Sequence, residues 1–382
     1  MNNFQIDFIT LLRSTLTDEI PNISDDFDFE AAFSYAMEFH LTPILFKGIN
    51  NLPKSIDFPG KRNAIANCCK EIAVNNLQMQ SIKKICNDFE KEGIDYCLIK
   101  GSELKYLYPS PELRPMSDAD ILIDVDKYDS IKEIMSKNGF VFLKETPHDY
   151  CYAKSGGVEF ELHKRLVDKA LKRDYRLFKD CWKHVDNHVL NPDMSYLYQF
   201  AHFSRHCFMG SIPLKHIIDL YIFKRKYPNL DMSFINSKLE ELELGEFHKN
   251  ITDLIDVWFC NAPSNESVDT ITDMVFWSRE KRNKQFRVSL FISSTGNNTA
   301  GKFQYLTSMI FPSFNEMQFL FPSLEKYPFL LPVFWIIRPF QYLTKKRNLT
   351  AKRFRETQSI DKKTVSEYSN LMKSIGLNNR KK

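Results

Sequence analysis

The sequence predicts an α+β protein, in which a small mixed β-sheet lies between an N-terminal helical region and a larger C-terminal helical region. Apolar residues recur at helical spacing through the first 92 residues and again after residue 165. Between these regions the spacing changes to that of short strands separated by glycine turns. The length of 382 residues leaves room for two or three structural units.

We expect four parts: an N-terminal helical region, a central α/β core, a C-terminal helical domain and a basic tail. Their expected bounds are 1–92, 93–168, 169–344 and 345–382. Within the first part, residues 62–92 are expected to form one long helix. Gly93 follows this helix, and a glycine in that place readily adopts the left-handed conformation that ends a helix.

The central core is expected to contain five short strands and two helices. The expected strands are 94–99, 120–125, 141–145, 149–154 and 158–162, and the expected helices are 103–108 and 127–138. Ser155, Gly156 and Gly157 separate the last two strands, so these strands are expected to pair as a hairpin.

The C-terminal part is expected to be helical, with interruptions at Pro192, Pro213 and Pro228. Its end differs in charge from the rest of the chain. Residues 338–382 contain 13 Lys and Arg against 3 Asp and Glu, although the whole chain has a formal net charge of only +4. Simple solvation of such a terminal extension is the plainer interpretation, and the alternatives are contact with a membrane surface, a nucleic acid or the acidic body of the protein.

Three features predict a cytoplasmic protein with reduced thiols. The eight cysteines show no CxxC spacing, which argues against a zinc or disulfide framework. The N-terminus has no basic segment before its apolar residues, unlike a signal peptide. The apolar run 328–340 is interrupted by Pro332 and Arg338, so no transmembrane helix is expected.

Acidic residues alternate with apolar residues in two of the predicted strands. Asp118 and Asp120 share one side of their strand, and Glu159 and Glu161 share one side of theirs, because residues two apart in a strand point the same way. Carboxylates at this spacing suit two divalent ions about 4 Å apart, as in phosphate-transfer sites. Oxygen ligands favour Mg²⁺ or Mn²⁺ over zinc.

A Lys-Gly-Ser turn follows the first predicted strand. Gly101 would let the backbone approach a phosphate, and Ser102 could cap the next helix or donate to that phosphate. Each feature has a plainer interpretation, because acidic strand faces are often simply solvated and strand-Gly-Ser-helix junctions are common. Their ordered combination within one α/β unit favours a functional site.

These residues resemble a known pattern. A Gly-Ser turn after a strand, a short helix, Asp-x-Asp at the head of a second strand and a later acidic residue resemble the nucleotidyltransferase superfamily that includes DNA polymerase β. More closely, LIKGSELKYLYPSPELRPMSDADILI, followed by FELHKRL, is similar to a bacterial family of uncharacterised nucleotidyltransferases. The segments AHFSRHCF, KHIIDLYIF and FPSLEKYPFLLPVFWIIRPF are similar to further parts of that family.

The resemblance implies a metal-dependent nucleotidyltransferase, which transfers a nucleoside monophosphate from an NTP to an acceptor. The acceptor could be a protein, a small molecule, a saccharide or RNA. Asp118 and Asp120 would bind Mg²⁺ or Mn²⁺, and Glu161 would be the third metal-binding carboxylate and help to deprotonate the acceptor.

The resemblance also implies a nucleotide-binding set of four residues. Gly101 and Ser102 would hold the triphosphate, and Lys100 and Arg114 would offset its charge. The alternative from a different class of function is a catalytically silent nucleotide-binding or regulatory module with the same residues.

Further residues are expected to line the cleft between the core and the helices. They are Glu159, His163, His202, His206 and Asp219, with His163 orienting the neighbouring Glu161. His202 and His206 lie four residues apart on a predicted helix and therefore share one side of it. With Asp219 and one further ligand, they would form an alternative metal site for hydrolysis.

Overall fold

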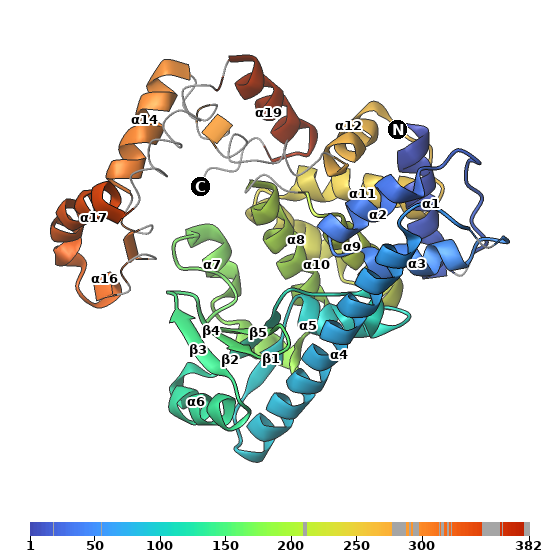
Figure 1. Cartoon of the computed structure of the whole chain (residues 1–382). Coiled ribbons are helices and arrows are strands. Elements are labelled where there is room, and N and C mark those ends of the chain that lie inside the picture. The colour runs from blue at the N-terminus through green and yellow to red at the C-terminus, as the bar shows by residue number, and fades with distance from the viewer. Residues whose placement is uncertain are drawn as a thin grey trace.

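The computed structural model confirms the α+β fold, with a mixed seven-stranded sheet flanked by helices (Figure 1). It describes residues 1–17, 19–54, 56–208, 212–276, 288–289, 292, 298–312, 314, 317–318, 321, 323–345, 360 and 362–377. Most of the basic tail, including residues 346–359, lies outside the described residues.

The N-terminal part is helical, as predicted, and four helices lie within its described residues. They are α1 (Asn3–Thr17), α2 (Phe29–Glu38), α3 (Thr42–Asn50) and α4 (Lys61–Lys91). The carboxylate of Asp28 accepts the N–H of Ala31 and caps α2. The 31-residue helix α4 confirms the expected long helix, and Gly93 beyond it has a φ of 61°.

The sheet has the order β3-β4-β5-β2-β1-β7-β6. Its strands are β1 (Tyr96–Leu98), β2 (Ala119–Ile123), β3 (Val141–Glu145), β4 (Asp149–Lys154), β5 (Val158–His163), β6 (Val185–Asp186) and β7 (Val189–Leu190). The central pair β2 and β5 is parallel, and β4 and β5 form the expected antiparallel hairpin. In the parallel pair, Asp120 lies opposite Glu161.

The two faces of the sheet contact different parts of the chain. Ile121 and Ile123 of β2 pack with α4 and with α6 (Tyr128–Lys137), whereas Leu122 belongs to the core of the helical parts. Figure 1 shows α6 and α4 beside the sheet on one side and α8 and α9 on the other. Because Asp120 is two residues from Leu122, its side chain belongs to the face that the C-terminal helices cover.

The first predicted core helix differs from its expected form. A short helix α5 (Gly101–Leu104) continues into two single-turn 3₁₀ helices, η1 (Lys105–Leu107) and η2 (Pro111–Leu113), before β2. Beyond β2, the 3₁₀ turn η3 (Val125–Lys127) leads into α6. The prediction of a single helix over 103–108 was therefore only partly correct.

The strands β6 and β7 were not predicted. Each has only two residues, too few for a recognisable alternation. They are joined by Asn187 and His188, which both have positive φ, as two-residue hairpin turns commonly require. These strands extend the sheet beyond the expected core bounds of 93–168, which stay a prediction.

The C-terminal part is mostly helical. Its helices are α7 (Lys172–Phe178), η4 (Cys181–His184), α8 (Pro192–Phe208), α9 (Leu214–Lys226), α10 (Met232–Glu241), α11 (Gly245–Phe259), α12 (Glu266–Val275), α14 (Asn298–Ile310), α16 (Ser323–Lys326), η5 (Pro328–Leu330), α17 (Leu331–Lys345) and α19 (Lys362–Ser374). Of the helices in the described ranges, none combines the length and hydropathy of a bilayer span.

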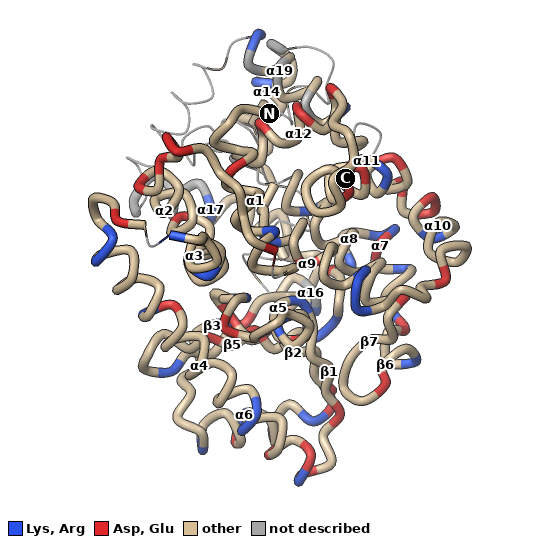
Figure 2. The backbone as a smooth tube through the Cα atoms, turned by 90° about the vertical axis from the view of Figure 1, so that its right-hand side faces the viewer, with Lys and Arg blue, Asp and Glu red and all other residues tan. Residues whose placement is uncertain are grey.

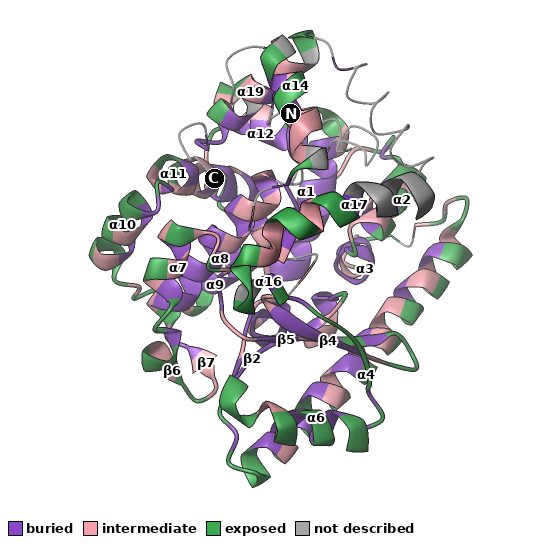
Figure 3. Cartoon of the chain, turned by 90° about the vertical axis from the view of Figure 1, so that its left-hand side faces the viewer, coloured by how far each residue is buried: buried purple, intermediate pink, exposed green. Residues whose placement is uncertain are grey.

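Charge and burial are distributed unequally over these elements. Figure 2 shows acidic and basic residues interspersed over the surface helices, such as α4, α6 and α10. Figure 3 shows that α8 and α9 are largely buried, whereas α6 and α17 present many exposed residues. All eight cysteines are free thiols, and only Cys69 and Cys260 are exposed.

Candidate active site

The predicted carboxylates lie where β2 and β5 run side by side. Asp120, Glu161 and His163 each offer a ligand atom, and these atoms lie within 4.8 Å of one another. Asp120 is 5% exposed, and Asp118 is half-buried at the head of the same strand. Asp118 lies outside this three-residue cluster, and its Oδ1 accepts a hydrogen bond from Ser117 Oγ at 2.7 Å.

Two basic groups hold one oxygen of Asp120. Lys100 Nζ donates to Asp120 Oδ1 at 2.7 Å, and His163 Nε2 lies 2.7 Å from the same oxygen. Burial acts to raise the pKa of Asp120, but Lys100 and His163 outweigh burial and hold this pKa well below its ordinary value. The aspartate is therefore ionised and bound to a cation of the protein itself.

Lys100 reaches Asp120 from a strained position. Its φ of 53° and ψ of −129° are rare for a residue with a side chain and cost about 1–3 kcal/mol. Burial acts to lower the pKa of Lys100, but the charge of Asp120 raises it above its usual value. The strained turn thus keeps a charged ammonium group beside the carboxylates.

Glu161 differs from Asp120 in its electrostatics. Burial, together with the charges of Asp118 and Asp120, raises the pKa of Glu161 to about 7. Its Oε2 lies 3.8 Å from His163 Nε2. A carboxylate with a pKa near neutrality can accept a proton at working pH, which suits a general base. Glu159, two residues earlier, is exposed and lies outside the cluster.

The Gly-Ser turn packs directly against β2. Ser102 is fully buried, and its Oγ accepts the backbone N–H of Asp120 at 2.9 Å. A Cβ on Gly101 would lie 3.3 Å from Cβ and Sδ of Met116, which is tighter than ordinary contact. Gly101 and Ser102 therefore determine how closely the turn approaches strand β2. Their contact with a triphosphate stays a prediction.

Arg114 and Asp219 form a buried ion pair between the loop before β2 and helix α9. Arg114 donates from Nε to Asp219 Oδ1 at 2.7 Å and from Nη2 to Oδ2 at 2.8 Å. Tyr108 Oη donates to Asp219 Oδ1 at 2.7 Å. Asp219 is only 2% exposed, so its burial does not support the predicted place on a cleft surface. The nucleotide-binding role of Arg114 stays a prediction.

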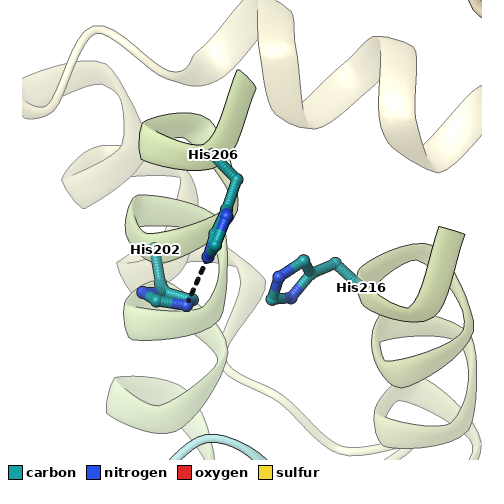
Figure 4. A group of neighbouring side chains, drawn as sticks. All are labelled: His202, His206 and His216. Atoms are coloured by element: carbon teal, nitrogen blue, oxygen red, sulfur yellow. Dashed lines mark hydrogen bonds between the residues drawn. The ribbon is translucent and has the colours of Figure 1, made fainter. Parts of the chain in front are cut away.

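His202 and His206 lie together on α8, and His216 points toward them from α9 (Figure 4). The Nε2 atoms of His202 and His206 are 3.0 Å apart. A ring nitrogen of each of the three histidines lies within 4.8 Å of the others. Asp219 lies outside this histidine group, and its carboxylate binds Arg114 and Tyr108. The alternative in which Asp219 completes a metal site with His202 and His206 therefore gains no support and stays a prediction.

Sequence reasoning missed Lys215 and His148 near the carboxylates, and His216 beside the other two histidines. The charges of Asp118 and Asp120 act on Lys215 of α9, and the ring of His148 contacts the ring of His163 with centroids 4.9 Å apart. Burial and the neighbouring His163 lower the pKa of His148 to about 2. Lys215 and His216 lie within the segment KHIIDLYIF, so the family resemblance was the one signal that pointed to them.

The residues present fit a divalent ion. Asp120 and Glu161 supply carboxylate oxygens, Asp118 immediately precedes β2, and the ligand atoms of the cluster are close enough to share one ion. The ammonium group of Lys100 already binds Asp120 Oδ1, which shows that this oxygen attracts a cation. An ion there would compete with Lys100 for Asp120.

Fold and site together define a class: an α+β protein with a group of two carboxylates and one imidazole that could hold a metal ion. Residues 25–260 match the family model described as "Uncharacterised nucleotidyltransferase". Since this match covers more than half of the chain, the protein belongs to that family, which supports nucleotidyltransferase activity in general. No curated protein and no solved structure gave a significant match.

Proposed function

We propose that the protein is a metal-dependent nucleotidyltransferase, which transfers a nucleoside monophosphate from an NTP to a hydroxyl or phosphate acceptor and releases pyrophosphate. The observation that carries this proposal is the cluster of Asp120, Glu161 and His163 on adjacent parallel strands, beside the charged Lys100. The family match supports the class of reaction.

The proposed reaction forms one bond and breaks one. An acceptor oxygen attacks the α-phosphorus, and the bond between that phosphorus and the oxygen bridging to the β-phosphate breaks, so that pyrophosphate leaves. Glu161 would take the proton of an acceptor hydroxyl, because its carboxylate lies beside Asp120 on the adjacent strand. Mg²⁺ or Mn²⁺ at Asp118, Asp120 and Glu161 would neutralise phosphate charge and activate the attacking oxygen.

Other residues would bind and orient the substrates. Lys100 would exchange part of its contact with Asp120 for the phosphates, and Gly101 and Ser102 would bring the turn close to them. His163 holds Asp120, and this contact orients the carboxylate. His202 and His206 would line the same region, since the charge of Lys100 acts on both imidazoles.

Several wider assignments belong to the same proposal. The parallel pair that carries Asp120 and Glu161 supports membership of the superfamily that includes DNA polymerase β. Eight free thiols suit the reducing cytoplasm. The acceptor is a protein, a small molecule, a saccharide or RNA, and the basic tail contacts an acidic lipid surface or nucleic acid.

The test measures transfer of label from each α-labelled NTP in the presence of Mg²⁺ or Mn²⁺, with cell extract as the source of acceptors. Wild type should release pyrophosphate and label an acceptor. Asp118→Asn combined with Asp120→Asn should lower transfer at least a hundredfold, because the acidic ligands are lost. Unchanged transfer by this variant would refute the proposed site.

The matched control is Asp126→Asn. Asp126 is an exposed carboxylate in η3, beyond the other end of β2, and its backbone N–H donates to Asp124. This variant removes one negative charge near the same strand and should transfer label at the wild-type rate. Metal-supported nucleotide binding without transfer by any NTP would instead favour the catalytically silent module.

A further inference from the structure

The three histidines at the junction of α8 and α9 have the arrangement of metal ligands. Two Zn–N bonds of about 2.0–2.1 Å at a tetrahedral angle place their nitrogens about 3.3 Å apart. The Nε2 atoms of His202 and His206 are 3.0 Å apart, and a ring nitrogen of His216 completes a set within 4.8 Å. Figure 4 shows the three rings converging from two helices.

The protein leaves part of this histidine cluster unsatisfied. Nε2 of His216 is buried and has no hydrogen-bond partner in the described part of the chain. Arg205 Nη2 lies 3.5 Å from Nδ1 of His202, at the far limit for a hydrogen bond, so this contact constrains the His202 tautomer only weakly. The Nε2 atoms of His202 and His206 hydrogen-bond each other at 3.0 Å, and a metal ion would replace that bond. The Nε2 atom of His216 has no such bond to give up.

The imidazoles are in the protonation state that binds metal. Burial lowers the pKa of all three, with the charges of Lys215 and Lys100 acting in the same direction on His206 and His216. A neutral imidazole keeps one lone pair free for an ion. The positive charges of Lys215 and Lys100 would repel a metal ion that had only neutral ligands. They therefore favour an anion as the fourth ligand of the ion.

We propose that His202, His206 and His216 bind one transition-metal ion of the Zn²⁺ type, with an anion or water as the fourth ligand. This site differs from the carboxylate cluster in its donors, because imidazole suits zinc, whereas carboxylates suit Mg²⁺ and Mn²⁺. The ion would join the end of α8 to the first turn of α9. Helix α9 also carries Asp219, which holds Arg114 before β2, so the ion would stabilise the contact between helices and sheet.

The test titrates the metal-free, untagged full chain with Co²⁺ in excess Mg²⁺, so that Mg²⁺ competes for the carboxylates. Wild type should develop the strong visible absorption of tetrahedral Co²⁺ with one equivalent, and Zn²⁺ should abolish it. His206→Asn and His216→Asn should each weaken binding at least tenfold, because each removes a ligand. Absence of this absorption in wild type, or its retention by both variants, would overturn the proposal.

Two controls distinguish this site from other metal-binding groups. His248→Asn removes a half-buried imidazole of α11, which lies 3.1 Å from the Tyr196 hydroxyl, and should leave the spectrum unchanged. The combined Asp118→Asn and Asp120→Asn variant should also keep the spectrum, even though it should lose nucleotide transfer. Loss of the spectrum in the latter variant would assign the ion to the carboxylates and overturn the three-histidine site.

A further measurement needs no substitution. X-ray absorption of the zinc-loaded wild-type chain should show imidazole nitrogens at about 2.0–2.1 Å and no sulfur at about 2.3 Å. Sulfur ligands would assign the ion to cysteines, such as the exposed Cys69 or Cys260, and would overturn the proposal.

Discussion

Glu103 is a buried acid that stands apart from the carboxylate cluster. It lies in α5, is 8% exposed, and both its oxygens lie within 3.0 Å of Ser195 Oγ, which donates to the carboxyl. Burial raises the pKa of Glu103 to about 8 from its ordinary value of 4.5, and the negative charge of Asp219 adds to the increase. The folded protein therefore holds this carboxyl protonated at neutral pH.

This shift predicts that Glu103 makes the protein less stable as pH rises from about 5 to about 8. In this interval the folded chain binds a proton that the unfolded chain has released, so the free energy of unfolding falls by up to about 1.4 kcal/mol per pH unit. Glu103→Gln removes the titrating group and keeps an amide for Ser195. The stability of this variant relative to wild type should increase with pH and become constant above about pH 8.

Urea unfolding at several pH values measures this difference. Glu133→Gln, the same chemical change at an exposed position of α6, corrects for the general effect of removing a carboxylate. A stability difference between Glu103→Gln and wild type that does not vary with pH would show that Glu103 is ionised in the folded protein.

Between elements, the buried ion pair of Arg114 with Asp219 joins the loop before β2 to helix α9. Its two hydrogen bonds join residues 105 positions apart, and both side chains are less than 7% exposed. Removing one partner leaves the other charge buried and uncompensated. This loss lowers the free energy of unfolding by more than the intact pair adds to it. The pair therefore determines how α9 lies against the loop before β2.

We expect Asp219→Asn to lower the free energy of unfolding by about 3–5 kcal/mol, as for other broken buried ion pairs. Urea unfolding followed by circular dichroism measures the change. The matched control is Asp253→Asn in α11, which removes a carboxylate from a surface pair with Lys249 and should cost about 0.5 kcal/mol or less. Equal effects of the two substitutions would contradict a structural role for the buried pair.

Contacts within the sheet could be predicted from the sequence more readily than contacts between helices. Alternation of apolar and acidic residues placed Asp120 and Glu161 on one face, because a strand has a period of two. The partners of Asp219, and the approach of His216 to His202 and His206, could not be predicted in this way. They depend on how α8 and α9 pack against the sheet, and the spacing of residues along one helix contains no information on a second helix.

At the scale of the whole molecule, one row of exposed apolar residues lies along η5 and α17. Phe329, Val333, Ile336 and Ile337 are 40–74% exposed and follow one another at helical spacing along η5 and α17. The sequence that follows, 345–355, contains six Lys and Arg and no acidic residue. An apolar helix face next to a basic segment suits an acidic lipid surface better than nucleic acid, which offers no apolar layer to bury these side chains.

We therefore predict that the full chain binds vesicles containing acidic phospholipids more tightly than neutral vesicles, and that salt weakens this binding. Val333→Asp combined with Ile336→Asp should weaken binding at least tenfold, since each buried side chain is worth about 1.5–3 kcal/mol and the new charges repel the surface. Vesicle co-sedimentation measures this change.

Val141→Asp on β3 is the matched control, because Val141 is 66% exposed but lies on the sheet, and this variant should bind as wild type does. Equal binding to neutral and acidic vesicles, or no effect of the α17 substitutions, would contradict a lipid-facing role for this helix.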